Sequence, residues 1–110
     1  MLIDFDTIPE EVLDHFKGGE KALHTHAFND ELNRIMFSRL EPGATIGYHE
    51  HPVTSETMFF IAGKGTVLYD DQRFTIHAGQ CHYCPVGHSH SVINDGTEDL
   101  VFYAVVPKHK

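Results

Sequence analysis

The sequence predicts an all-β fold in which about nine short strands close into a double-sheet, jelly-roll β-barrel, preceded by one short N-terminal helix. Two observations support this prediction. From residue 21 onward, short runs rich in Val, Ile, Phe, Tyr and Thr alternate with turn residues, which is typical of sandwiches and barrels. The chain has 110 residues, so these strands belong to a single domain, predicted over residues 1–110. Closure into a barrel protects the edges of so many short strands.

The helix is predicted over residues 8–17. Pro9 suits the first position of a helix, and the two glutamates after it suit the positive end of the helix dipole. Val12, Leu13 and Phe16 then form one apolar stripe, before a pair of glycines ends the segment.

The barrel is predicted over residues 22–107. Each of its strands is a run of β-branched and aromatic residues, and clusters of Pro, Gly, Asn or Asp with known roles in turns separate many of them. The predicted strands are 22–28, 34–41, 45–51, 55–61, 65–70, 72–77, 80–84, 90–94 and 100–106.

The composition excludes several classes of partner. Sixteen acidic and eight basic residues give a net charge of −8, which repels nucleic acids and anionic membranes. The N-terminus carries acid where a secretion signal carries Lys or Arg, and no apolar run approaches the ~20 residues of a membrane span. The only two cysteines, Cys81 and Cys84, fit a reducing compartment. We therefore expect a cytoplasmic protein without nucleic-acid or membrane partners.

Ten histidines raise the expectation of metal or acid–base chemistry. Side chains alternate along a strand, so His49 and His51 project from one face. Glu56 returns on the next predicted strand, where its carboxylate can lie beside the two imidazoles. His90 offers a third imidazole, delivered just after a tight turn.

Residues 43–63 and 79–94 resemble the two motifs of the cupin superfamily, G(X)5HXH(X)4E(X)6G and G(X)5PXG(X)2H(X)3N, with every fixed position filled. The resemblance covers residues 34–106 and is to small single-domain bacterial cupins of the cupin 2 conserved barrel type. It implies a cupin barrel that holds one divalent metal. The ligands it implies are His49, His51, Glu56 and His90.

The predicted donors are three imidazoles and one carboxylate, without a thiolate. This set suits Fe, Mn, Ni, Zn, Co or Cu better than Ca or Mg. Four protein ligands leave one or two positions open on a metal that takes five or six, which is what a Lewis-acid or oxygen-activating site requires.

Two functions are consistent with such a site. The first is a metalloenzyme that acts on a small organic acid, sugar or hydroxyketone, as an isomerase, epimerase, lyase or dioxygenase. Its candidate catalytic residues are His82 and His88, because they flank the turn that positions His90. The favoured alternatives are a core or interface histidine for His82 and an exposed turn residue for His88. The second function is a non-catalytic cupin that binds a small, sugar-like molecule through its metal.

Five residues are expected to line the pocket. Alternation along the strand points Met58 and Phe60 into the barrel, and Met36, Ser38 and Tyr103 are expected beside them. The wall of the predicted pocket is therefore mainly apolar, and this affects which ligands the pocket can bind.

A phosphosugar ligand would require an Arg or Lys in the cavity. The only arginines on predicted strands are Arg34, Arg39 and Arg73. Phosphosugars therefore rank below small uncharged or carboxylate ligands.

We also expect a homodimer. The apolar stripe of Val12, Leu13 and Phe16, together with the strand at 22–28, offers a surface that a second copy could cover.

Overall fold

The computed structural model describes residues 1–109 and contains ten β-strands in that range. The predicted all-β jelly-roll fold is confirmed, and each of the nine predicted strands is present within a few residues of its expected position. The strands are β1 (Glu11–Asp14), β2 (Ala22–Asn29), β3 (Asn33–Leu40), β4 (Thr45–Glu50), β5 (Glu56–Ala62), β6 (Lys64–Tyr69), β7 (Gln72–His77), β8 (Cys81–Cys84), β9 (Ser89–Ile93) and β10 (Leu100–Pro107).

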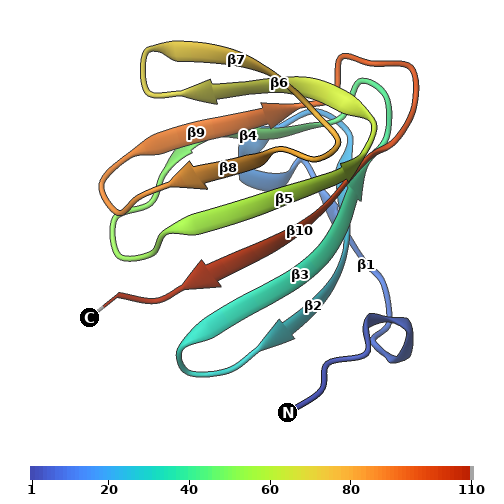
Figure 1. The fold of residues 1–110 in the computed structure, drawn as a ribbon, viewed down its shortest axis with the longest axis vertical. Coiled ribbons are helices and arrows are strands. Elements are labelled where there is room, and N and C mark those ends of the chain that lie inside the picture. The colour runs from blue at the N-terminus through green and yellow to red at the C-terminus, as the bar shows by residue number, and fades with distance from the viewer. Residues whose placement is uncertain (110) are drawn as a thin grey trace.

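The strands form two antiparallel sheets that pack face to face. The larger sheet has the order β1-β2-β3-β10-β5-β8, and the smaller has the order β4-β9-β6-β7. In Figure 1 one twisted layer consists of β2, β3, β10, β5 and β8, and the smaller sheet lies above it. Strands that are far apart in sequence therefore become neighbours, as β10 does with β3 on one side and β5 on the other.

The predicted helix over residues 8–17 is wrong. This segment contains strand β1, and the only helical turns near it are short 3-10 turns at Phe5–Thr7 (η1) and Phe16–Gly18 (η2). A helix of ten residues is marginal on its own, whereas the edge of β2 offers unpaired backbone groups that β1 satisfies by antiparallel pairing. Leu13 and Phe16 still pack against the core, as an apolar stripe would.

An apolar core lies between the two sheets. Its members come from both layers, so the sheets hold each other in place by burial of apolar surface. The most deeply buried are Leu23, Leu40, Ala44, Met58, Phe60, Val67, Val92, Leu100, Phe102 and Ala104.

Across residues 1–109, no helix combines the length and the apolar character needed to cross a membrane.

Candidate metal centre

The four candidate ligands come from both sheets. His49 lies on β4 and His51 follows its last residue, while His90 lies on β9, directly opposite His49 in the strand pairing. Glu56 is the first residue of β5 in the larger sheet. The packing of one sheet on the other therefore brings the carboxylate to the three imidazoles.

The four side chains form one compact cluster. The Nε2 atoms of His90 and His51 lie 3.1 and 3.3 Å from the same Oε1 of Glu56. The two Nε2 atoms are 2.9 Å apart, and the ligand atoms of all four residues, His49 included, lie within 4.8 Å of one another. Metal bonds to imidazole and carboxylate are about 2.0–2.2 Å long, so one ion among these atoms is within reach of all four.

Local hydrogen bonds orient two of the imidazoles. The Nδ1 of His49 lies 2.7 Å from the carbonyl oxygen of Gly47, which can only accept, so this ring carries its proton on Nδ1. The Nδ1 of His51 lies 2.7 Å from the hydroxyl of Thr54. Metal-binding histidines commonly use their second nitrogen in this way, which leaves Nε2 for the ion.

Electrostatics give the cluster protonation states that suit a cation. Burial alone would raise the pKa of Glu56, but hydrogen bonds with His51 and His90 outweigh it and lower that pKa to about 2. Burial lowers the pKa of His49, and its hydrogen bond to Gly47 opposes this only in part. Near neutral pH the carboxylate is therefore charged and the His49 imidazole is neutral, as metal ligation requires.

A cavity of about 300 Å³ opens beside the cluster. Its wall includes three of the four candidate ligands and several charged side chains from neighbouring elements. Arg34 on β3 is held along this wall, because its Nη1 donates to Asn29 Oδ1 at 3.1 Å and its Nε approaches Met36 Sδ at 3.2 Å. Lys17 and Lys108 also line the cavity.

Only one of the five expected lining residues, Met36, borders this cavity. Met58 and Phe60 point inward but are buried in the core, and the Ser38 hydroxyl is buried against Thr25, 2.7 Å away. A small barrel is filled by side chains, so an inward-pointing residue often lies deeper than the pocket.

Tyr103 was expected at the pocket but lies on the opposite face of its strand. Its neighbours Phe102 and Ala104 are both buried, so alternation turns Tyr103 outward. There its ring packs against Phe37 and Phe5, with centroids 4.8 and 5.8 Å apart. The expected pocket-lining role of Tyr103 is therefore wrong.

The two candidate catalytic histidines lie in different places. His82 is buried on β8, and its Nε2 lies 2.9 Å from Nδ1 of His90, so it touches a candidate ligand directly. The side chain of His88 is 44% exposed, and its Nδ1 lies 2.6 Å from Asp70 Oδ2. Its ring stacks on Tyr69. The side-chain polar contacts of His88 are therefore with Asp70 and Tyr69, and only its backbone carbonyl contacts the cluster, by accepting a hydrogen bond from the backbone N–H of His51.

The fold and the ligand cluster agree with a comparison against protein families. The model of the cupin domain matches residues 36–106, which contain all four candidate ligands. The chain belongs to the cupin family.

Two named relatives are similar to this chain in sequence. This cupin is 27% identical over 112 residues to the oxalate-binding protein of Thermotoga maritima, and the match covers 96% of this chain and 93% of that protein. It is 35% identical over 95 residues to the oxalate decarboxylase OxdC of Bacillus subtilis. That match covers 79% of this chain but only 25% of OxdC.

Solved structures share the fold of this cupin. A predicted oxalate decarboxylase from Thermotoga maritima superposes with a TM-score of 0.91 at 24% identity, covering 98% of this chain and 99% of that one. A Cupin 2 conserved barrel domain protein from Salinispora arenicola superposes with a TM-score of 0.70 at 22% identity, covering 96% and 85%.

Several residues around the site of this cupin were missed by sequence reasoning. The position of Thr54, three residues after His51, carried a weak signal because it lies in the turn between two ligand-bearing strands. Lys17 and Lys108 carried none, because the folded chain brings them from opposite ends of the sequence. Arg34 was one of three candidate strand arginines, and its proximity to the cavity depends on the β3–β10 pairing.

Proposed function

We propose that this cupin binds one divalent transition metal through His49, His51, Glu56 and His90 and, at that metal, a small carboxylate ligand of the oxalate type. The observation that carries the proposal is the placement of Arg34 in the same cavity as the ligand cluster. The proposal is supported by similarity over nearly the full chain to a protein named for oxalate binding.

The charges in the cavity suit a small dianion. The carboxylate of Glu56 would cancel one of the two positive charges of a divalent ion. The guanidinium of Arg34 adds one positive charge, so the net charge offered to a ligand is again about that of a divalent ion. A guanidinium also matches a carboxylate geometrically, because it can donate two parallel hydrogen bonds. The net charge of the chain is −8, so local positive groups are needed to attract an anion.

The size of the cavity also favours a small ligand. At about 300 Å³ it lies at the lower end of the range for ligand sites. A bound metal would supply a Lewis acid for a ligand oxygen, while Arg34 binds the other end of the ligand and Met36 contributes an apolar wall.

Metal and ligand binding can be tested separately. Elemental analysis of the purified protein is expected to find a transition metal, in a ratio near one per chain. Calorimetry of the metal-loaded protein is expected to detect oxalate and to give much weaker binding for acetate, which has one carboxylate. If the protein binds metal but not oxalate, the proposed metal site stands and the proposed class of ligand is rejected. Binding of neutral sugars instead would favour the sugar-like alternative.

A second candidate is decarboxylation of such an acid, a lyase reaction. It is supported by the 35% identity to the oxalate decarboxylase domain and by Glu50, an ionisable carboxyl group that lines the cavity. In this reaction the carbon–carbon bond of hydrogen oxalate breaks, one carbon leaves as carbon dioxide, and the other takes a proton to become formate.

Carbon-13 NMR of labelled oxalate distinguishes an enzyme from a binding protein. Formate would show turnover, and unchanged oxalate that still binds would favour the binding protein. Oxygen consumption with catechols, or isomerisation of a uronate, would instead favour the dioxygenase or isomerase predicted from sequence.

A further inference from the structure

Among the three candidate histidine ligands, only His90 has its Nδ1 atom in contact with another imidazole. Its Nδ1 lies 2.9 Å from Nε2 of His82. By contrast, the Nδ1 atoms of His49 and His51 lie beside oxygen atoms, a backbone carbonyl and a hydroxyl.

The nitrogen of His90 that would face the metal determines which nitrogens of His90 and His82 carry a proton. The Nε2 of His90 faces Glu56 and His51, so it is the nitrogen that would bind the ion. A neutral imidazole bound through Nε2 carries its proton on Nδ1 and can only donate from it. His82 must then accept that hydrogen bond through its own Nε2.

We propose that His82 is a positioning residue of the metal centre, which holds the ring and the tautomer of His90 by accepting a hydrogen bond from its Nδ1. The inference rests on the proposed binding of a metal by His90. It assigns His82 a role through His90 and not a direct one on the bound ligand, because His82 does not line the cavity that contains Arg34.

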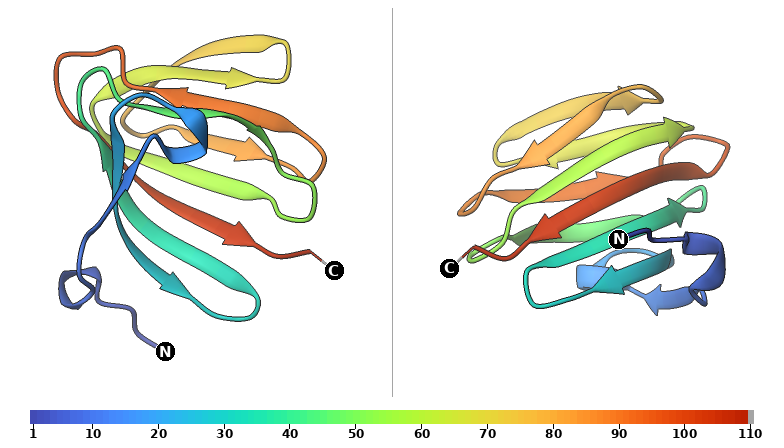
Figure 2. Two further views of the ribbon diagram at one scale, coloured as in Figure 1. Left: turned by 180° about the vertical axis from the view of Figure 1, so that it is seen from behind. Right: turned by 60° about the horizontal axis from the view of Figure 1, so that its bottom comes forward.

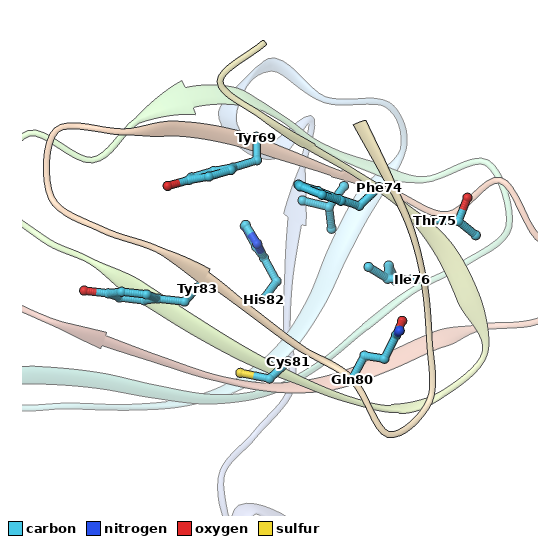
Figure 3. Close-up of a pocket in the computed structure, with 9 residues that line it drawn as sticks. Tyr69, Phe74, Thr75, Ile76, Gln80, Cys81, His82 and Tyr83 are labelled. Atoms are coloured by element: carbon cyan, nitrogen blue, oxygen red, sulfur yellow. The ribbon is translucent and has the colours of Figure 1, made fainter. Parts of the chain in front are cut away.

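The surroundings of His82 fix its orientation. It lies on β8 opposite Met58 of β5, and the ring of Tyr69 packs against it edge-on, with centroids 5.7 Å apart. On its other side His82 borders a second cavity, of about 480 Å³, between the β6–β7 hairpin and β8. Figure 3 shows its ring standing in the wall of this cavity between Tyr69 and Tyr83.

The second cavity explains how a histidine can occupy this position. Among residues 1–109, no buried side-chain nitrogen or oxygen lacks a hydrogen-bond partner. The Nδ1 of His82 has no partner among these residues, so it lies at the surface of the cavity, where water can accept its proton. His82 can therefore remain in the tautomer that accepts from His90.

The test compares three variants of the full chain by their affinity for Co²⁺ and by the visible spectrum of the bound ion. His82→Leu removes the acceptor, and we expect it to weaken Co²⁺ binding by about 10–100-fold and to change the spectrum. His82→Gln offers an amide oxygen as acceptor, and we expect it to restore most of the affinity. Phe74→Ala alters the same cavity without a bond to His90, and we expect it to bind Co²⁺ like the unmodified protein.

Thermal unfolding of each metal-free variant separates a loss of the site from a loss of the fold. Equal Co²⁺ affinities and spectra in all three variants and the unmodified protein would overturn the positioning role and leave the proposed metal site intact. Equal losses in His82→Leu and His82→Gln would also overturn it, because the hydrogen bond would not be the cause. An unmodified protein that binds no Co²⁺, Mn²⁺ or Zn²⁺ would overturn both proposals.

Discussion

The backbone of Gly47 on β4 lies directly against the backbone of Lys17 in the η2 turn. A Cβ atom on Gly47 would lie 1.9 Å from the carbonyl oxygen of Lys17, far inside contact distance. Figure 2 shows this turn beside β4. The carbonyl of Gly47 also accepts the hydrogen bond from His49. This close approach therefore fixes the strand next to a candidate ligand.

Gly47→Ala is accordingly expected to weaken both the fold and the metal site. The added methyl group must push η2 away from β4, and overpacking of this kind costs about 1–3 kcal/mol. Urea unfolding and a metal titration would measure the two effects. Gly96→Ala is a milder control, since its Cβ would lie 3.1 Å from the nearest atom. Equal stability of the two variants would contradict the importance of the contact.

His51→Ala is expected to abolish stoichiometric metal binding while the barrel remains folded. The substitution removes a ligand, whereas the fold depends on apolar burial between the two sheets. Elemental analysis and circular dichroism would measure the two properties. His77→Ala is the matched control, because it removes an exposed imidazole. Full metal content in His51→Ala would reject this ligand, and an insoluble variant would indicate a structural site.

Arg34→Gln is expected to weaken oxalate binding by about tenfold or more, since a hydrogen bond to a charged group contributes about 1.5–3 kcal/mol. Metal affinity is expected to stay unchanged because Arg34 is not among the clustered ligands. Calorimetry would measure both constants. Arg73→Gln is the control, an exposed arginine on β7. Equal oxalate affinity in the two variants would remove Arg34 from the ligand site.

The two cysteines are expected to differ sharply in reactivity. Cys81 is exposed and Cys84 is buried, because residues three apart on a strand face opposite sides. Burial, followed by the negative charge of Glu56, raises the pKa of the Cys84 thiol to about 11. At pH 8 this thiol stays protonated, so iodoacetamide should label Cys81 alone, as mass spectrometry would show. Rapid labelling of both, or a disulfide between them, would contradict this arrangement.

The strands could be predicted from local patterns, because turn residues separate them and alternation places His49 and His51 on one face. The full ligand cluster, which joins the two sheets, was predicted from the resemblance to the two cupin motifs. The segment around Leu13 was misassigned because a short apolar pattern does not distinguish a helix from a strand. Its pairing with β2, which is not local, decided the outcome.

The pocket was harder to predict than the ligands. Alternation shows which face a residue occupies but not how deep it lies, so Met36 and Met58 were indistinguishable in sequence. In the structure Met36 borders the cavity and Met58 is part of the core. The contact between His82 and His90 joins β8 to β9 across the two sheets, and no spacing within the motif predicts its geometry.

An apolar row on the outer face of the larger sheet bears on the predicted homodimer. Phe37, Tyr103 and Phe59 lie opposite one another on β3, β10 and β5. The exposed fractions of Phe59 and Tyr103 are 48% and 39%. In the stripe expected on a helix, Leu13 and Phe16 pack on the core of their own chain and are therefore not free to contact a second copy.

We therefore expect the homodimer interface at this row and not at the N-terminal segment. A two-fold axis parallel to the plane of the sheet would place the row against the same row of a second copy, which is a self-complementary contact without formal charges. Sedimentation at micromolar concentration is expected to give twice the 12.4 kDa of one chain. Phe59→Lys should produce monomers because it buries like charges at the axis, whereas Phe74→Lys, on the other sheet, should remain dimeric. A mass of one chain for the unmodified protein would reject the dimer, and dimers in both variants would place the interface elsewhere.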